Sequence, residues 1–324
     1  MNILGIESSC DETGAAVVKD GSRIISNVVV TSLKIHQKYG GIIPEIASRR
    51  QLECVHSIVD QALTEAKLKL KDIDSVAVTQ TPGLIGSLLV GTSFAQALSF
   101  AINKPLIRIN HIEAHIYANF LSPSNPVNNS ILAENSHLPA IGLVVSGGHT
   151  CLFHIKNLKK FRLIGNTRDD AVGETFDKVG KILGLGYPGG PVIDRLAQKG
   201  ANPNLTFTCA QIPDSLDFSF SGIKTAVLYY YRDHKNAKDF SINSVAKAFQ
   251  DSVIAILVKK CISACQKFKT KTLFIGGGVA ANSGLRNKLN NEARPLGIKV
   301  YFPPIPLCLD NAAMIAGLGY HKAQ

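Results

Sequence analysis

Short runs of apolar residues alternate along this chain with longer segments whose apolar positions recur every three or four residues. The short runs are typical of buried strands, and the longer segments are typical of helices that pack on a sheet. Strands are predicted at residues 3–7, 14–19, 23–30, 75–79, 106–109, 140–145, 151–155 and 272–275. Helices are predicted at about 44–68, 83–102, 110–120 and 192–198, and over most of 226–267. One further helix is predicted to end at residue 183, another to begin at about 283, and the last to begin at 310. This alternation predicts an α/β protein.

Each half of the chain opens with two predicted strands joined by a short turn of small and polar residues. The first turn is Ser-Ser-Cys-Asp-Glu-Thr at residues 8–13, and the second is Ser-Gly-Gly-His-Thr at 146–150. Such turns can offer backbone N–H groups and hydroxyls to a phosphate. Residues 122–137, rich in Asn, Ser and Pro, are predicted to form a linker or surface loop between the halves. The pattern predicts a duplicated fold whose two lobes hold a nucleotide between them.

One apolar segment, residues 83–102, has no charged side chain and is long enough to cross a membrane. It also contains four Ser and Thr residues and Gln96, and it follows a predicted strand. A buried helix packed on a sheet therefore explains the segment better than a membrane span. The chain begins directly with a strand and shows no signal or transit segment, which favours a cytoplasmic protein.

The composition shows an excess of basic over acidic residues. The 324 residues include 35 Lys and Arg against 24 Asp and Glu, a formal charge of +11. An excess of this size suits a polyanionic partner such as RNA, although charge spread evenly for solubility would give the same total. Two basic clusters, residues 156–162 and 259–271, are interpreted as solvated helix ends and faces.

The seven cysteines are odd in number and form no C-x-x-C pair. This argues against a disulfide framework and against a structural zinc site, and it again favours the cytoplasm.

Two histidines stand four residues apart in the sequence His111-Ile112-Glu113-Ala114-His115, at the start of a predicted helix. At 3.6 residues per turn both imidazoles project from one face and can bind one metal ion, although ordinary packing histidines show the same spacing. Zinc proteases with a related motif need Glu directly after the first His, where this chain has Ile112. Glu113 points away from the metal side of the helix, so a protease is disfavoured.

An acidic residue, Asp310, opens the last predicted helix. Its simplest role is to cap the helix N-terminus. Together with His111 and His115, however, it would form a set of two histidines and one carboxylate with open positions, which suits Fe(II) or Zn(II).

Two glycine loops are candidate nucleotide contacts. The loop at 184–191 matches G-x-G-x-x-G, but it follows a helix and contains Pro188, so a dinucleotide fingerprint is disfavoured. The loop at 276–282 joins a strand to a helix N-terminus, which is a favourable position for a phosphate or nucleotide. The chain has no G-x-x-x-x-G-K-[ST] sequence, which excludes the P-loop class.

Eight longer stretches, spread over nearly the whole chain, resemble the motifs of the universal tRNA threonylcarbamoyltransferase family, called TsaD in bacteria and formerly described as O-sialoglycoprotein endopeptidases. They are GIESSCDET (5–13), GGIIPEIASR (40–49), HIEAH (111–115), VSGGHT (145–150), FDKVGKILGLGYPGGP (176–191), DFSFSGIKT (217–225), GGGVAAN (276–282) and DNAAMIA (310–316). Val144 and His149 stand where archaeal and eukaryotic relatives carry a metal-binding Tyr and an Asn, so the chain resembles the bacterial branch.

The resemblance implies a two-lobed actin/Hsp70/sugar-kinase fold with RNase H-like sheets and an active site in the cleft. Residues 1–135, completed by a helix at about 310–324, would form the N-terminal lobe, and residues 136–309 the C-terminal lobe. The implied reaction transfers threonylcarbamoyl from threonylcarbamoyl-adenylate to N6 of adenosine 37 in tRNAs that read codons starting with A, and it releases AMP.

The resemblance also implies roles for individual residues. His111, His115 and Asp310 resemble the ligands of one divalent metal per subunit, with Fe(II) preferred and Zn(II) as the alternative. The loop facing the phosphate and threonylcarbamoyl group corresponds to Val144, Val145, Ser146, Gly147 and Gly148. The contacts to ribose and adenine, which would also accept ATP, ADP or AMP, correspond to Asp177, Gly190, Asp194 and Asn282.

Threonylcarbamoyl-adenylate is a mixed anhydride with a good leaving group, so its transfer needs positioning and charge stabilisation rather than a protein nucleophile. The amine of adenosine is a weak nucleophile, and Asp11 or Glu12 is a candidate to accept its proton. The implied partners are tRNA, a TsaB-like paralogue and a TsaE-like ATPase, with no membrane. A kinase or ATPase of the same fold and a non-catalytic RNA-binding scaffold are the alternatives.

Overall fold

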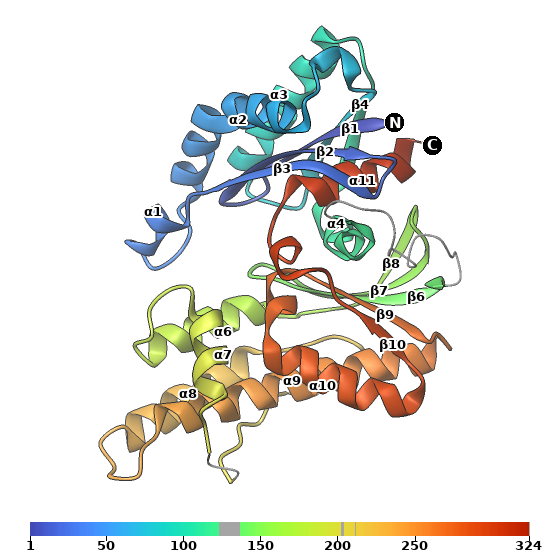
Figure 1. Ribbon diagram of the computed structural model, residues 1–324. Helices are drawn as coiled ribbons and strands as arrows, with labels where there is room; N and C mark the ends of the chain where they lie inside the picture. The colour runs from blue at the N-terminus through green and yellow to red at the C-terminus, as the bar shows by residue number, and fades with distance from the viewer. Residues whose placement is uncertain (123–136, 202–203, 211, 324) are drawn as a thin grey trace. The chain divides into compact units, whose positions relative to one another are not determined.

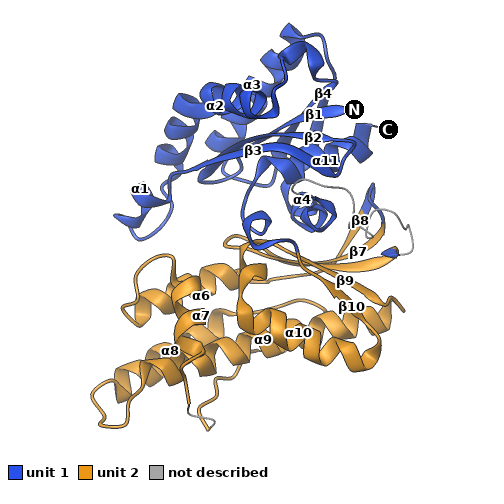
Figure 2. Cartoon of the chain, viewed as in Figure 1, with its two compact units in different colours: residues 1–137, 157–160, 303–324 blue, residues 138–156, 161–302 orange. Residues whose placement is uncertain are grey.

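The computed structural model describes residues 1–122, 137–201, 204–210 and 212–323, and it contains two five-stranded sheets (Figure 1). The chain divides into two compact units (Figure 2). Unit 1 consists of residues 1–137, 157–160 and 303–324, and unit 2 consists of residues 138–156 and 161–302. The lobe boundaries expected from the sequence, and the RNase H-like character of each lobe, stay predictions.

The sheet of unit 1 has the strand order β3-β2-β1-β4-β5. Its central strand β1 pairs antiparallel with β2 and parallel with β4. The strands are β1 (Asn2–Glu7), β2 (Glu12–Lys19), β3 (Arg23–Thr31), β4 (Ser75–Thr81) and β5 (Leu106–Asn110). The helices are α1 (Leu33–Gln37), α2 (Pro44–Ala66), α3 (Ile85–Ala101), α4 (His111–Tyr117) and α11 (Ala312–Ala323).

Alternating residues of β1 face two different layers of helices. Leu4 and Ile6 belong to the apolar core shared with α2, including Val55 and Ile58. Gly5, which points to the other side, lies against α11, because a Cβ at this position would lie 2.4 Å from the carbonyl oxygen of Ala312. Figure 1 shows α2 and α3 on one face of the sheet and α11 on the other. A helix from the far end of the chain therefore completes the N-terminal unit.

The sheet of unit 2 has the order β10-β9-β6-β7-β8. The strands are β6 (Ala140–Val145), β7 (Thr150–Asn157), β8 (Lys160–Asn166), β9 (Thr272–Gly276) and β10 (Lys299–Tyr301). The helices are α6 (Val172–Ile182), α7 (Gly189–Ala197), α8 (Ser221–His234), α9 (Ile242–Lys267) and α10 (Ser283–Ala293). The long helix α9 buries many of its side chains and contacts β6, β9, α7 and α10, so it forms the centre of this unit.

Short 3-10 turns complete the secondary structure. They are η1 (Leu70–Asp72), η2 (Ala118–Phe120), η5 (Gly278–Ala281), η6 (Arg294–Leu296) and η7 (Ile305–Leu307).

Several expectations from the sequence need correction. Residues 156–162 form the β7–β8 hairpin instead of a helix end, and strands β8 and β10 were not predicted. Helix α3 buries one face of small residues, including Ser87 and Gly91, while Ile85 and Phe100 remain more than four-fifths exposed. The predicted linker falls almost entirely on residues 123–136, which lie outside the described residues.

Among the helices in the described part of the chain, none is long and apolar enough to cross a membrane.

A carboxylate in unit 2, Asp170, joins α6 to α8. It accepts hydrogen bonds from Lys178 of α6 at 2.7 Å and from Lys224 of α8 at 2.6 Å. Partial burial acts to raise the pKa of Asp170, but the hydrogen bonds and charges of the two lysines outweigh burial and lower it. Because the folded-state pKa is depressed, the stabilisation exists above the unfolded pKa near 4 and is lost as the pH falls through the lower folded value.

We expect Asp170→Asn to lower the free energy of unfolding at pH 7 by about 1 kcal/mol, a figure that allows for solvent screening of the partly exposed lysines. The difference from the parent protein should shrink towards pH 3. Urea unfolding at both pH values measures it. Asp233→Asn, which removes an exposed ion pair with Arg232 on α8, is the matched control. Equal losses from both variants, or a loss that does not change with pH, would contradict this explanation.

Candidate functional site

A buried carboxylate at the end of β1, Glu7, organises the candidate metal centre in unit 1. It accepts hydrogen bonds from the backbone N–H of Ser9 and from the hydroxyl of Thr79, both at 2.6 Å. Its other contact is the Nδ1 atom of His111, 3.0 Å away. Because a carboxylate only accepts, Nδ1 of His111 carries the hydrogen and its Nε2 atom is left for another ligand.

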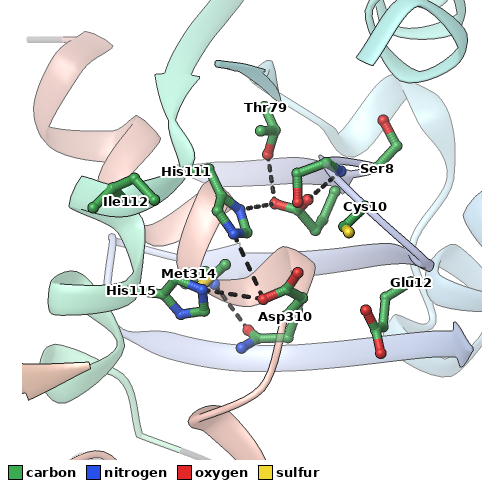
Figure 3. A network of polar contacts seen from close by, with 12 residues as sticks. Ser8, Cys10, Glu12, Thr79, His111, Ile112, His115, Asp310 and Met314 are labelled. Atoms are coloured by element: carbon green, nitrogen blue, oxygen red, sulfur yellow. Dashed lines mark hydrogen bonds and ion pairs between the residues drawn. The ribbon is translucent and has the colours of Figure 1, made fainter. Parts of the chain in front are cut away.

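His111, His115 and Asp310 come together as a group whose potential ligand atoms all lie within 4.8 Å of one another. Oδ1 of Asp310 lies 3.6 Å from Nε2 of His111 and 3.0 Å from Nε2 of His115 (Figure 3). His115 is fully buried, yet neither of its ring nitrogens has a hydrogen bond of good geometry. Buried polar atoms are normally satisfied, so this side chain is positioned for a ligand other than protein. The donor set and its geometry fit a divalent metal ion.

The helix that carries the two histidines begins at His111 because Asn110 caps it. The side-chain oxygen of Asn110 accepts the backbone N–H groups of Ile112 and Glu113. Glu113 forms an ion pair with Lys322 of α11 at 2.5 Å, away from the two histidines. The predicted direction of Glu113 is therefore confirmed.

The default interpretation of Asp310 as a helix cap is wrong. Helix α11 begins at Ala312, and the side-chain oxygen of Asn311 accepts the backbone N–H of Met314. Asn311 therefore caps the helix, and the carboxylate of Asp310 extends towards the histidines (Figure 3).

The electrostatics of this group depend on its burial and its crowded carboxylates. Burial acts to lower the pKa of His111, but the charges of Glu7 and Asp310 outweigh burial and raise it to about 9. Burial acts to raise the pKa of Glu7, but the charge and hydrogen bond of His111 outweigh burial and lower it. Glu7 therefore stays ionised as a buried anion beside the two histidines. Without a metal, His111 is therefore the cation that pairs with Glu7 at neutral pH, and a metal ion binding at its Nε2 atom would replace the proton there.

The turn after β1, residues 8–12, is held in place by α2 and α3. The side-chain amide of Gln51 in α2 donates to the carbonyl oxygens of Cys10 and Glu12 at 2.9 and 3.1 Å. The hydroxyl of Ser87 in α3 donates to the carbonyl of Cys10 at 3.1 Å. These contacts fix the backbone that carries Asp11 and Glu12 beside the metal-ligand group.

Burial and then the charges of Asp310 and Asp11 raise the pKa of Glu12 to about 9. A carboxyl in this position holds a proton at neutral pH unless a nearby cation offsets these charges.

In unit 2 the turn between β6 and β7 forms the candidate substrate loop. The backbone N–H of Ser146 donates to the carbonyl of His149, and the hydroxyl of Ser146 accepts the N–H of His149 in return. Gly147 and Gly148 form the exposed tip of this turn. The predicted loop residues Val144, Val145, Ser146, Gly147 and Gly148 therefore form the end of β6 and the turn that follows it.

Two glycines let other segments approach this loop closely. A Cβ on Gly173, in the first turn of α6, would lie 2.5 Å from the carbonyl oxygen of Ser146. A Cβ on Gly277 would lie 2.3 Å from the carbonyl oxygen of Val145, and Gly277 has φ +91 and ψ 163, a conformation essentially restricted to glycine. The substrate loop, the start of α6 and the glycine loop after β9 thus form one compact cluster.

The G-x-G-x-x-G segment joins α6 to α7. Asp177 of α6 accepts the backbone N–H of Gly189 at 2.8 Å, and it also receives a backbone hydrogen bond from Gly190. Burial acts to raise the pKa of Asp177 above its usual value, although these two N–H groups oppose the effect. Asp177 therefore fixes the start of α7 and holds Gly190 beside it.

Asp194 and Asn282, predicted as separate contacts, meet through Ser283 and Gln250. The carboxylate of Asp194 accepts the backbone N–H and the hydroxyl of Ser283, at 3.0 and 2.9 Å. It also accepts the amide of Gln250 at 3.1 Å, while Asn282 donates to the Gln250 oxygen at 2.7 Å. The Asn282 oxygen caps α10 through the N–H of Leu285. This network leaves Asn282 one amide hydrogen and Asp194 further acceptor capacity for a ligand.

Sequence reasoning missed two residues that position the candidate site residues. Glu7 contacts His111, and Gln250 contacts Asp194 and Asn282. Both are buried polar residues in apolar surroundings, one at the end of a strand and the other in the middle of a long helix. A buried polar residue of this kind is a signal that it has a specific partner.

Comparison with known proteins identifies the chain at the level of family. A sequence model of TsaD, described as tRNA N6-adenosine threonylcarbamoyltransferase, matches residues 23–317. A relative of that name from Dictyoglomus turgidum is 46% identical over 325 aligned residues, which span 100% of this chain and 94% of the relative. The chain belongs to the TsaD family. Another TsaD relative, from Fusobacterium nucleatum, is 48% identical and spans 100% of this chain and 92% of its own.

The fold also agrees with the expectation for a TsaD protein. The ROK hexokinase from Thermus thermophilus superposes with a TM-score of 0.51 at 16% identity, covering 100% of both chains. At this identity the likeness shows the fold alone, and it confirms the predicted actin/Hsp70/sugar-kinase class. The matched range of the TsaD family model includes the metal-ligand group of unit 1 and the candidate substrate loops of unit 2.

Proposed function

We propose that this chain transfers the threonylcarbamoyl group from threonylcarbamoyl-adenylate to N6 of adenosine 37 in tRNAs that read codons starting with A, releasing AMP. The main support is the buried His111, His115 and Asp310 group in a chain whose relatives of 46 and 48% identity are named tRNA N6-adenosine threonylcarbamoyltransferase.

His111, His115 and Asp310 would hold one divalent metal, with Fe(II) preferred and Zn(II) as the alternative. A set of two histidines and one carboxylate with open positions is typical of Fe(II) sites and is also used by Zn(II). When bound, such an ion supplies positive charge to a substrate oxygen as a Lewis acid. Glu7 fixes the tautomer and the ring orientation of His111.

A protein nucleophile is not required, and the thiol of Cys10, which feels the charge of Asp310, is unsuited to this role. Burial and then the charges of Asp11, Asp310 and Glu12 raise the pKa of Cys10 far above its usual value. Cys10 therefore stays a thiol at neutral pH, and only the thiolate is an effective nucleophile. This supports direct attack by the adenosine amine on the mixed anhydride.

Asp11 and Glu12 are the candidates to accept the proton from this amine. Glu12 needs the charge of a nearby cation to be ionised at neutral pH, because burial and its acidic neighbours raise its pKa to about 9. Single-turnover transfer with Asp11→Ala and Glu12→Ala distinguishes the two. If both variants transfer at the parental rate with intact tRNA and adenylate binding, neither residue is the proton acceptor.

The residues of unit 2 would bind the adenylate. The exposed turn around Gly147 and Gly148 would face the phosphate and threonylcarbamoyl group. Asp177, Gly190, Asp194 and Asn282 would bind the ribose and adenine, using the hydrogen-bonding capacity that their internal contacts leave.

Gln250 is expected to act through Asp194 and Asn282. Gln250→Ala removes one hydrogen-bond partner from each side chain, while Asp194 keeps its bonds from Ser283 and Asn282 keeps the N–H of Leu285, at a cost of about 1–3 kcal/mol. We therefore expect the KM for threonylcarbamoyl-adenylate to rise about tenfold while kcat changes less. Steady-state kinetics and calorimetry with AMP measure the effect, and Gln266→Ala, on an exposed part of the same helix, is the matched control. An unchanged KM would show that Gln250 does not support binding of the adenylate.

A TsaB-like paralogue and a TsaE-like ATPase are the proposed protein partners. The apolar face of α3 supports a site for the paralogue, because Ile85, Leu89 and Phe100 are 86, 63 and 88% exposed. Leu89→Asp should prevent formation of the heterodimer in size-exclusion chromatography without changing the melting temperature of the isolated chain. A variant that still forms the heterodimer would place the paralogue elsewhere.

Mass spectrometry of tRNA nucleosides tests the proposed activity. The chain, its two partner proteins and threonylcarbamoyl-adenylate are incubated with unmodified tRNA, and the modified adenosine is expected only when all are active. An unmodified product would contradict the proposal. Multiple-turnover ATP hydrolysis or phosphorylation of a small molecule without tRNA would instead favour a kinase or ATPase of the same fold.

A further inference from the structure

The excess positive charge of this chain lies almost entirely in unit 2. Residues 138–156 and 161–302 contain 21 Lys and Arg against 11 Asp and Glu, a formal charge of +10. The residues of unit 1 contain 14 Lys and Arg against 13 Asp and Glu, a formal charge of +1. A charge needed only for solubility has no reason to be concentrated in one of the two units.

Within unit 2, much of this charge comes from two stretches of sequence without acidic residues. No Asp or Glu occurs between Glu134 and Asp169, or between Asp251 and Glu292. The first stretch contains β7 and β8, whose connecting residues 157–160 are grouped with unit 1, and the second contains the end of α9, strand β9 and the start of α10. Both basic clusters noted in the sequence belong to these stretches.

The two stretches meet on the side of the unit 2 sheet where β7 ends and β8, β9 and β10 begin. Ile141 of β6 pairs with His154 of β7 on one side and with Leu273 of β9 on the other. The ring of His154 also stacks on Phe268, just after α9, with 4.6 Å between ring centroids. Lys299 of β10 donates its backbone N–H to the carbonyl of Lys271. The end of β7 and the starts of β8, β9 and β10 therefore form a continuous basic edge, with exposed side chains Lys156, Arg162, Lys267, Lys269, Lys271 and Lys299.

The edge has the dimensions and the local potential of a polyanion site. Five neighbouring strands span about 19 Å at 4.7–4.9 Å per strand, so the charges form a row rather than a point. The burial of His154 and the charges of Lys156 and Arg162 lower the pKa of His154, so both cations act on this ring. A row of cations beside stacked, partly exposed rings suits a nucleic-acid backbone better than a single small anion.

We propose that the basic edge of unit 2 binds the phosphate backbone of the tRNA substrate, an inference that rests on the proposed function. The edge lies at the opposite end of β6 from the Ser146–Gly148 turn, roughly 20 Å away at 3.3 Å per residue. A tRNA is several times longer than this. It can therefore present its reacting base at one place and its backbone phosphates at another. The edge then contributes affinity and orientation, while the base is selected elsewhere.

The test uses the chain together with its partner proteins and an unmodified tRNA transcript. The variant replaces Lys156, Arg162, Lys269 and Lys299 with Gln, and leaves Lys271, which donates to the carbonyl of Leu296, unchanged. The matched control replaces four exposed lysines of unit 1, Lys19, Lys34, Lys67 and Lys71, with Gln. Fluorescence anisotropy at several salt concentrations gives the affinity for tRNA and its salt dependence.

The edge variant is expected to bind tRNA at least about tenfold more weakly, with a slope of log K against log salt reduced by about 3. Its KM for tRNA should rise, while AMP binding and turnover at saturating tRNA are retained. The control should keep the parental slope. Equal slopes for the edge variant and the parent, or loss of a partner protein instead of tRNA, would overturn the proposal. If tRNA binds at the basic edge in a salt-dependent way but is not modified, the proposed function is contradicted and the proposed RNA-binding site is supported.

Discussion

His111→Ala is expected to abolish transfer, reducing the rate at least about 100-fold. The change removes a proposed metal ligand and the ionic partner of Glu7, which then keeps only its hydrogen bonds from Ser9 and Thr79 as a buried anion. Loss of about 3 kcal/mol or more of charge stabilisation corresponds to this factor. Elemental analysis should show substoichiometric metal in the purified variant, and tRNA nucleoside analysis should show little or no product.

Glu113→Gln is the matched control for this prediction. Glu113 lies in the same short helix but pairs with Lys322, away from the metal-ligand group. The variant should keep its metal and its transfer rate and lose only a little stability. If Glu113→Gln lost activity as severely as His111→Ala, or if His111→Ala kept full activity, the proposed metal site would be wrong.

Gly277→Ala is expected to have the second largest effect. The backbone of Gly277 adopts a conformation that costs other residues about 1–3 kcal/mol, and a Cβ would also lie 2.3 Å from the carbonyl of Val145. The clash is with backbone, so it can be relieved only by moving the loop after β9 or the end of β6. We expect the affinity for AMP and for threonylcarbamoyl-adenylate to fall at least about tenfold, together with the melting temperature.

Calorimetry with AMP and thermal unfolding measure both effects of this change. Gly222→Ala is the control, because a Cβ there has no neighbour within 4 Å and the residue lies in helix α8. A Gly277→Ala protein with parental affinity and melting temperature would show that the contact with Val145 does not hold the substrate loop.

The local parts of the site were predictable from the sequence because they follow short periodicities. The i and i+4 spacing placed His111 and His115 on one face of a helix, and Glu113 away from it. The strand, glycine loop and helix at 272–293 were also predictable, because an apolar run, glycines and a capping Asn follow one another in sequence. The set of Asp310 with the two histidines was open to prediction from residue chemistry only as an alternative to a helix cap, and the resemblance to a known family favoured it.

Contacts between distant positions could not be predicted. Nothing near Glu7 in the sequence indicates that its carboxylate meets a histidine 104 residues later. The exposure of α3 was missed because its fully buried positions are small residues, while Ile85, Leu89 and Phe100 face outward. Strand β8 was missed although polar and apolar residues alternate in it, because its positive charges were attributed to a helix end. In each case the structure depends on contacts with residues distant in the sequence, which local composition does not reveal.

The packing of α11 on β1 also has a consequence for protein synthesis. Gly5 can contact Ala312 only after the ribosome has added about 300 further residues, which takes roughly 15–60 s at 5–20 residues per second. By then all of unit 2 has been synthesised. We therefore expect the unit that begins the chain to be the last to mature, and metal to be acquired only after Asp310 has emerged from the ribosome. Nascent chains stalled before this residue should bind no metal at this site.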